Sequence, residues 1–187
     1  MIHAVFTDEM MELLRAMKGK VFKSYQCIMD NRWHRTEGNV RINLGRSSID
    51  LNCYLHDVDY FGEPEEMAFF TCTSADPKSE FRPYVAGDAQ VYMVDEPITG
   101  IELVRDHVVH NNGECVIDMD IALVVQTKFH TITFSRGIWY SETIVIAVSN
   151  PGEAPASLEP VEDLWYDDAP YEEPSFTTEV ERAFIVL

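Results

Sequence analysis

The segment 106–120, DHVVHNNGECVIDMD, holds the densest group of side chains that could ligate a metal ion or transfer a proton. Imidazole and carboxylate groups are the ligands of zinc and other transition metals in many hydrolases. On a strand, however, His107 and His110 would point to opposite faces because they are three positions apart. Asn111-Asn112-Gly113 is typical of a turn. We therefore interpret the segment as an exposed hairpin, with a metal site as the weaker alternative. The candidate ligands are His107, His110, Glu114 and Asp120.

The segment 30–39, DNRWHRTEGN, places an aromatic ring among cations, between turn-forming residues. Trp and Arg contribute a large share of the binding energy at many protein interfaces. One interpretation is a hairpin loop whose Trp folds back onto the core, and the other is a contact surface for a protein partner. The candidate partner-binding residues of this segment are Arg32, Trp33 and Arg35.

Two aromatic pairs stand at equivalent places before apolar runs, in YFGE at 60–63 and in WYSE at 139–142. A pattern that recurs at the entrance of a strand is typical of packing, so we expect these rings to cover an open end of the fold. The alternative is that they line the pocket of a small-molecule-binding barrel. The candidate pocket residues are Tyr60, Phe61, Trp139 and Tyr140.

The elements that position these residues begin with a short helix in TDEMMELLRAMKGK, residues 7–20. Thr7 or Asp8 can cap its first amides, and Gly19 can end it. Its apolar residues form one stripe that we expect to pack on a sheet. These residues are Met10, Leu13, Leu14 and Met17.

Residues 20–150 follow the alternation of apolar and polar residues that is typical of strands. The order strand, strand, strand, aromatic corner, strand occurs twice, which predicts an internal duplication; coincidental alternation is the alternative. The sequence thus predicts a mainly β (β-rich α+β) fold, with the helix packed on a barrel or sandwich of about eight strands. The expected parts of this single domain are the helix (1–19), a first repeat (20–75), a connector with an early strand (76–96), a second repeat (97–150) and an acidic tail (151–187).

The net charge of −18 disfavours binding to nucleic acid and to anionic membranes. No apolar run approaches the roughly 20 residues of a membrane-spanning helix, and the beginning does not resemble a signal peptide. Four widely separated cysteines without a ligand pair indicate buried, reduced thiols. We therefore expect a cytoplasmic protein, and its recurring YFGE and WYSE endings are of a kind that a bacterial domain family would repeat.

The tail combines ten acidic residues and a single Arg with prolines and aromatic rings. Disorder alone would not need such rings, so we expect the tail either to dock or to be displayed to a foreign protein partner. Docking would occur on its own body or on a second copy, with the mildly basic residues 1–50 as the expected complement. The candidate contact residues are Trp165, Tyr166, Tyr171 and Phe176.

The common catalytic motifs are absent from the sequence, among them the GxSxG elbow, the P-loop, GxGxxG, HExxH and the EF-hand. A catalytic triad built from distant residues would leave no such trace. We expect a non-catalytic binding or interaction protein without a cofactor, which binds a protein partner or associates with itself as a homodimer. The alternatives are a small-molecule-binding barrel and a metal-dependent hydrolase.

Overall fold

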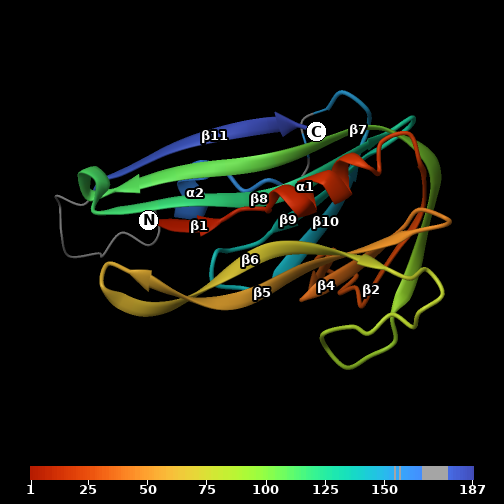
Figure 1. The fold of residues 1–187 in the computed structure, drawn as a ribbon, viewed down its shortest axis with the longest axis horizontal. Helices are drawn as coiled ribbons and strands as arrows, with labels where there is room; N and C mark the ends of the chain where they lie inside the picture. Colours follow the sequence, from red (N-terminus) through yellow and green to blue (C-terminus); the bar gives the residue numbers. More distant parts are fainter. Residues whose placement is uncertain (154, 156, 166–176) are drawn as a thin grey trace.

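The computed structural model describes residues 1–153, 155, 157–165 and 177–187. It has 58% of its residues in strands and 9% in helices, so the prediction of a β-rich fold with a short N-terminal helix is confirmed. The helical elements are α1 (Asp8–Arg15), η1 (Asn111–Gly113) and α2 (Val161–Trp165). The strands are β1 (Ile2–Ala4), β2 (Val21–Cys27), β3 (Arg35–Glu37), β4 (Asn39–Asn43), β5 (Ser48–Tyr60), β6 (Glu63–Ala75), β7 (Gln90–His110), β8 (Cys115–Thr127), β9 (Thr131–Arg136), β10 (Thr143–Ser149) and β11 (Thr178–Val186) (Figure 1).

These strands form one hydrogen-bonded sheet with the main order β3-β10-β9-β8-β7-β2-β4-β5-β6. In addition, β11 pairs with β7 and β1 pairs with β8, and the β1–β8 pair runs parallel while the others are antiparallel. The sheet folds over into two layers. One layer contains β1, β8 and β11, and the other contains β2, β4, β5 and β6 (Figure 1).

β7 connects the two layers because its halves have different partners. Its first part, up to Pro97, pairs with β2, whereas its second part, from Ile98 to His110, pairs with β8. The register of the second ladder shifts between Ile98 and Gly100, and such an irregularity bends a strand and increases its twist. Figure 1 shows β7 curving from one layer into the other.

A second link between the layers runs through β3 and β4. β3 pairs with β10, whereas β4 pairs with β2 and β5. Gly38 stands between the two strands with a φ of +76°, a conformation that residues with a Cβ rarely adopt. The bend at Gly38 thus sends one short stretch of chain from the edge of β10 to the edge of β2.

The hairpin of β5 and β6 shows how the sequence fixes a turn. Tyr60 pairs with Glu63, which leaves Phe61 and Gly62 as a two-residue loop with φ values of +55° and +85°. Positive φ at both loop residues is the geometry of a type I′ turn, whose twist matches that of paired strands. The first aromatic corner is therefore the tip of this hairpin.

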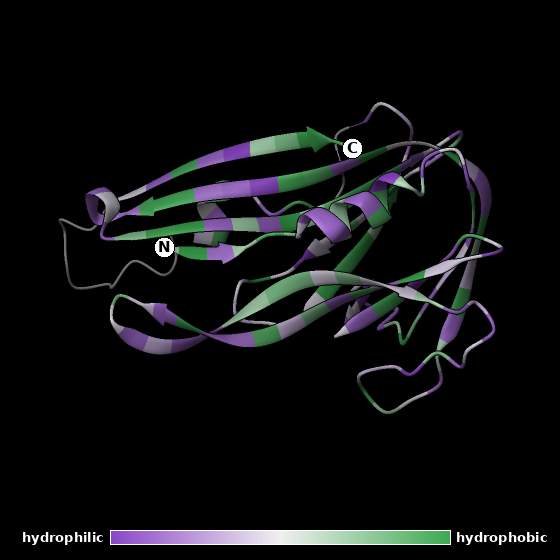
Figure 2. Ribbon diagram, in the orientation of Figure 1, coloured by the Kyte–Doolittle hydropathy of each residue, from purple (hydrophilic) through white to green (hydrophobic). Residues whose placement is uncertain are grey.

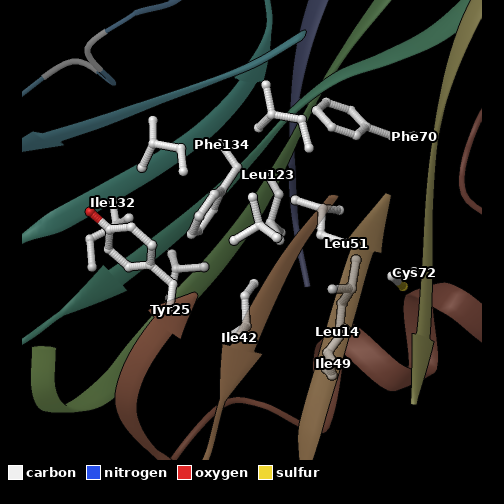
Figure 3. Packing of buried hydrophobic residues seen from close by; sticks show 14 of the residues in the cluster. Leu14, Tyr25, Ile42, Ile49, Leu51, Phe70, Cys72, Leu123, Ile132 and Phe134 are labelled. Carbon is white, nitrogen blue, oxygen red and sulfur yellow. The ribbon is translucent and has the colours of Figure 1, made fainter. Parts of the chain in front are cut away.

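The buried apolar residues form two clusters. The first gathers alternate residues of β2, β4, β5, β6, β8 and β9 together with Leu14, and part of it is seen in Figure 3. The second surrounds Val104, Met119, Trp139 and Trp165. Figure 2 shows hydrophobic and hydrophilic residues alternating along the strands, which is the pattern that the sequence analysis used. The four cysteines are buried and unpaired, as predicted.

α1 begins as the sequence predicts, because the Thr7 side chain accepts a hydrogen bond from the Met10 amide at 3.3 Å. Leu14 and Met17 are fully buried, and the sulfur of Cys72 on β6 donates to the Met10 carbonyl oxygen at 3.6 Å. The expected stripe therefore packs on the sheet. The α-helix itself ends at Arg15, before the Gly that was expected to end it.

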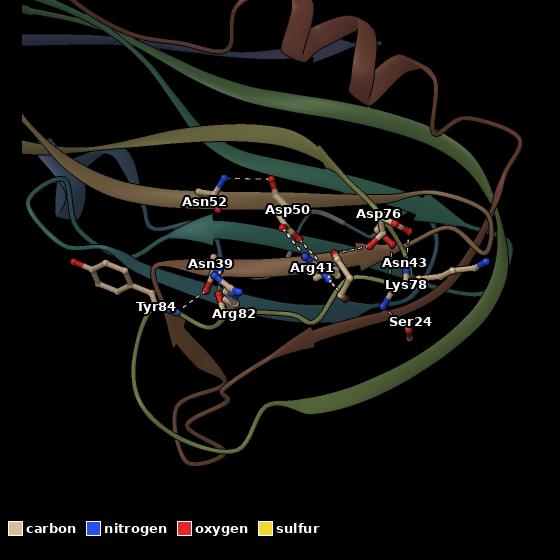
Figure 4. Close-up of polar contacts among 12 residues, drawn as sticks. Ser24, Asn39, Arg41, Asn43, Asp50, Asn52, Asp76, Lys78, Arg82 and Tyr84 are labelled. Atoms are coloured by element: carbon tan, nitrogen blue, oxygen red, sulfur yellow. Dashed lines mark hydrogen bonds and ion pairs between the residues drawn. The ribbon is translucent and has the colours of Figure 1, made fainter.

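A buried ion pair fixes the connector between β6 and β7 (Figure 4). Arg41 on β4 binds both carboxylate oxygens of Asp50, at 2.7 and 2.9 Å, and donates to the Ser79 carbonyl oxygen at 2.8 Å. The Asn39 amide donates to the Arg82 carbonyl oxygen at 2.9 Å. These groups satisfy one another, so we assign the network a structural role.

Each expected repeat corresponds to an antiparallel meander, β2-β4-β5-β6 in one case and β7-β8-β9-β10 in the other. The early strand of the expected connector is continuous with the first strand of the second meander, since β7 begins at Gln90. A common origin of the two meanders stays a prediction.

Candidate functional site

The two aromatic corners meet at one end of the molecule, which we call the corner end. The ring centroids of Tyr60 and Trp139 are 5.5 Å apart, and Phe61 and Tyr140 each pack edge-on against their neighbour in the sequence. The Arg136 guanidinium donates to the Trp139 carbonyl oxygen, and burial lowers the pKa of Arg136 to about 10. The four candidate pocket residues thus contact one another, and Trp139 and Tyr140 also line a cavity of about 540 Å³ beside Pro64, so a pocket role for these residues stays a prediction.

A cleft of about 760 Å³ opens beside Phe61, between β1 and the β5–β6 hairpin. Its two carboxylates are occupied by local turns: Asp59 accepts from the Gly62 amide at 2.7 Å, and Glu114 accepts from the Asn111 side chain at 3.2 Å. These hydrogen bonds stabilise the loops. Both carboxylates of the cleft are thus already engaged by neighbouring groups of the protein.

The structure separates the four candidate metal ligands. His107 pairs with Asp118 at 2.7 Å, and Asp120 binds Arg105 through both oxygens at 2.8 and 3.0 Å. His110 is buried, which lowers its pKa, and contacts the Thr178 hydroxyl at 3.0 Å, whereas Glu114 lies in the turn described above. No three His, Cys, Asp or Glu side chains in the described part of the chain are placed to hold a metal ion.

Trp33 does not fold back onto the core. Its side chain is 55% exposed, and the Arg32 guanidinium lies 4.9 Å from its ring centroid. Arg35 begins β3 and lies 3.9 Å from the Asp30 carboxylate. The three residues are accessible to a partner, and their role as an interface stays a prediction.

The described part of the tail lies on the body of the protein. β11 pairs with nine residues of β7, and Trp165 is buried with its indole nitrogen donating to Asp106 at 2.7 Å. Arg182 binds both oxygens of the same carboxylate, at 2.8 and 2.9 Å. The strand of the described tail thus pairs with β7 rather than with residues 1–50, whereas Ser157 lines a cavity together with Met29, Asn31 and His34. Tyr166, Tyr171 and Phe176 lie outside the described residues.

The opposite end, which we call the groove end, contains an open aromatic site. Tyr25 and Tyr92 stack with their centroids 4.9 Å apart and an angle of 11° between the rings. They line two cavities, of about 590 and 230 Å³, that also share Val148. We call this pair of cavities the Tyr25–Tyr92 groove. Figure 3 shows Tyr25 reaching between strands toward Ile132, which lines the smaller cavity.

The strand register explains why the groove exists. Tyr25 on β2 is directly opposite Tyr92 on β7, so the two rings share a face and stack as a cross-strand pair. β10 pairs with β3, and β2 pairs with β4. Because the chain bends at Gly38 between β3 and β4, β2 and β10 do not pair with each other. The loop after β2 bridges this gap, since the His34 carbonyl oxygen accepts from the Ile146 amide at 2.8 Å.

A buried carboxylate and a histidine stand at the smaller cavity. His130 Nδ1 lies 2.6 Å from Glu96, whose other oxygen accepts from the Thr127 hydroxyl at 2.6 Å and from the Phe129 amide at 3.0 Å. Burial by itself raises the pKa of Glu96, but these hydrogen bonds outweigh it and the pKa lies below its usual value. Burial, with smaller effects of Cys27 and Tyr92, raises the pKa of Tyr25 to about 12, so its phenol is neutral.

Sequence reasoning did not find this site. The segments VFKSYQC and QVYMVDE alternate as ordinary strands, and nothing local connects Tyr25 with Tyr92. His130 follows a Lys-Phe turn and has no other ligand-type residue at a recognisable spacing. The site depends on the pairing of β2 with β7, which is a property of the folded chain.

Comparisons of the chain with models of protein families, with curated proteins and with solved structures found no match. Neither α-helix in the described residues has the length and apolar character needed to cross a membrane.

Proposed function

We propose that the protein is a binding protein whose Tyr25–Tyr92 groove takes up a small aromatic molecule. The stacked ring pair beside an open cavity supports this proposal most directly. The larger cavity, at about 590 Å³, falls in the range of about 300–1,000 Å³ that is usual for small-molecule sites. Its wall combines apolar side chains of β10 with Met29, Asn31 and His34.

A binding role without catalysis accounts for the surroundings of the groove. Both tyrosines lie within strands and stack on each other, which limits the movement of their rings and favours a cavity that exists before a ligand arrives. The four unpaired thiols support the further proposal that the protein works in a reducing compartment such as the cytoplasm.

Titration with N-phenyl-1-naphthylamine, a neutral aromatic probe whose fluorescence rises in apolar sites, tests this function. We expect saturable binding of one probe per chain, weakened at least about tenfold by Tyr92→Ala, since a stacked aromatic contact and its burial are lost. Tyr84→Ala is the matched control, because Tyr84 is 52% exposed and lies outside the groove lining. Probe binding that is unsaturable, or equal in wild type and Tyr92→Ala, would contradict the proposal.

A protein partner, or a second copy of the chain, is the second candidate function. It is supported by the exposed Trp33 with Arg32 against its ring. Sedimentation of the purified protein at increasing concentration tests the homodimer. A mass that rises with concentration in wild type and stays monomeric in Trp33→Ala would support this role, whereas identical behaviour of the two proteins would exclude Trp33 from a self-association surface.

A further inference from the structure

Two polar groups that line the smaller cavity of the Tyr25–Tyr92 groove are prepared for hydrogen bonds that the described chain does not supply. They belong to Tyr25 on β2 and to His130, just before β9; both residues line the cavity, and neither the Tyr25 hydroxyl nor His130 Nε2 makes a hydrogen bond within the described part of the chain. Each is carried by a side chain whose other contacts fix its position. Their pairing indicates which chemical group a ligand should bring.

The Tyr25 hydroxyl belongs to a residue that is only 8% exposed. Its ring is held between Tyr92, which stacks on it, and Phe134, which meets it edge-on at 5.9 Å. The hydroxyl makes no hydrogen bond to the part of the chain that the structure describes. Because Tyr25 lines an open cavity, a ligand atom that binds this hydroxyl would take the place of water.

The His130 imidazole is oriented by the buried Glu96. A carboxylate can only accept, so the 2.6 Å contact places a ring proton on Nδ1, and in the tautomer with that single proton Nε2 presents its lone pair. The Thr127 hydroxyl and the Phe129 amide hold the carboxylate in turn. His130 is 47% exposed at its side chain and lines the same cavity as Tyr25.

We propose that the ligand of the groove is an aromatic molecule that carries a hydroxyl group, with this hydroxyl between the Tyr25 phenol and His130 Nε2. This inference rests on the proposed function, because it specifies the ligand of the same groove. A hydroxyl is the simplest group that can hydrogen-bond to both. It accepts a hydrogen bond from the Tyr25 O–H and donates its own proton to the His130 lone pair.

Other polar groups fit less well. A carboxylate has no proton to donate to Nε2, and the ionised Glu96 beside His130 repels it. A bare hydrocarbon leaves both protein groups without partners, and a site built for a hydroxyl discriminates against the analogue that lacks one. The aromatic part of the ligand would lie in the larger cavity along Tyr92 and Val148.

Competition against N-phenyl-1-naphthylamine tests the proposal with two probes of nearly equal shape, 2-naphthol and 2-methylnaphthalene. We expect wild type to bind 2-naphthol at least about tenfold more tightly, the effect of two hydrogen bonds. Tyr25→Phe and His130→Phe should each reduce this preference by about threefold or more. His107→Phe is the matched control, because His107 makes the same Nδ1 contact to a carboxylate but does not line the groove.

The outcomes separate this inference from the proposed function. A wild type that binds both probes equally, or a preference that persists in both Tyr25→Phe and His130→Phe, overturns the hydroxyl assignment, while probe binding that depends on Tyr92 leaves the binding function intact. Absence of any Tyr92-dependent binding overturns both. Retained binding of N-phenyl-1-naphthylamine shows that a variant still has an intact groove, and Tyr25→Phe, which removes a single oxygen atom, is the variant least able to disturb it.

Discussion

At the corner end, Tyr60 and Trp139 come from or adjoin turns, whereas at the groove end Tyr25 and Tyr92 come from the interiors of β2 and β7. Both ends bring together aromatic rings from distant parts of the chain, at centroid distances of 5.5 and 4.9 Å. At the corner end Trp139 is 8% exposed and held by Arg136, and the rings pack against one another, with a cleft of about 760 Å³ beside Phe61. At the groove end a cavity of about 590 Å³ remains beside the rings.

The difference shows how backbone context decides what an aromatic pair does. A turn can adjust its dihedral angles until its rings pack, as Phe61 and Gly62 do with positive φ at both positions. The backbone of a residue in the middle of a strand is held by hydrogen bonds on both sides, so it can adjust less than the backbone of a turn. The rings at the corner end thus cluster around the buried Trp139, whereas the two stacked rings at the groove end both line the neighbouring cavities.

Trp139→Ala should give the largest effect on stability. Truncation of a buried Trp removes much apolar area and leaves a cavity, which costs about 3–5 kcal/mol in the free energy of unfolding. Urea denaturation followed by circular dichroism measures the change. Tyr140→Ala is the control, since Tyr140 is 53% exposed and should change stability by less than about 1 kcal/mol. Equal losses of stability in the two variants would contradict a packing role of Trp139.

Tyr92→Ala should have the opposite balance of effects, with a small loss of stability and a large loss of probe binding. Tyr92 is half-buried and stacked on one side, so we expect a loss of about 1–2 kcal/mol of stability. The loss of probe binding should be at least about tenfold, whereas Trp139→Ala should leave binding nearly unchanged in the protein that remains folded. The same denaturation and fluorescence titrations measure both quantities. A loss of binding in Trp139→Ala alone would assign the ligand to the corner end.

Glu96→Gln should change the pH dependence of stability. Because the folded pKa of Glu96 lies below its usual value of 4.5, ionised Glu96 stabilises the fold above that pH. This contribution is lost as the pH falls through the folded pKa, so the advantage of wild type over Glu96→Gln should shrink below about pH 4.5. Denaturation at a series of pH values measures it. Thr127→Val, which removes one bond to the carboxylate, should reduce the pH-dependent difference, and a constant difference between wild type and Glu96→Gln would contradict the assignment.

Trp33→Ala should give the smallest change in stability, within about 0.5 kcal/mol, because the ring is 55% exposed and packs mainly against Arg32. A loss above about 2 kcal/mol in denaturation would show that the ring supports the groove through its loop. An unchanged stability together with altered association would assign Trp33 to an interface.

The sequence predicted those parts of the fold that depend on local pattern. The alternation of apolar and polar residues over 20–150 predicted strands, and Val40 and Ile42 lie in such strands, paired with Leu51 and Ile49. Thr7 caps its helix as expected. β3 was missed, because three polar residues in a turn-rich segment become a strand only by pairing with β10. The Tyr25–Tyr92 groove was missed for the same reason, since it arises where strands of distant origin meet.

The tail shows that net charge alone does not predict where a segment docks. Ten acids and one Arg suggested docking on the basic residues 1–50, yet that one Arg182 pairs with the buried Asp106, while β11 continues the sheet beside β7. Surface ion pairs contribute only about 0–1 kcal/mol each, whereas a buried charge must find its partner. The position of β11, the described strand of the tail, is therefore set by the Arg182–Asp106 pair and by its hydrogen bonds to β7 rather than by net charge.

The pairing of β11 with β7 has a consequence for biosynthesis. Arg182 lies 76 positions after the Asp106 that it neutralises. At translation speeds of about 5–20 residues per second, β7 emerges about 4–15 s before its neighbour is made. During that interval the nascent chain exposes both an unpaired strand edge and an acidic group meant for the interior.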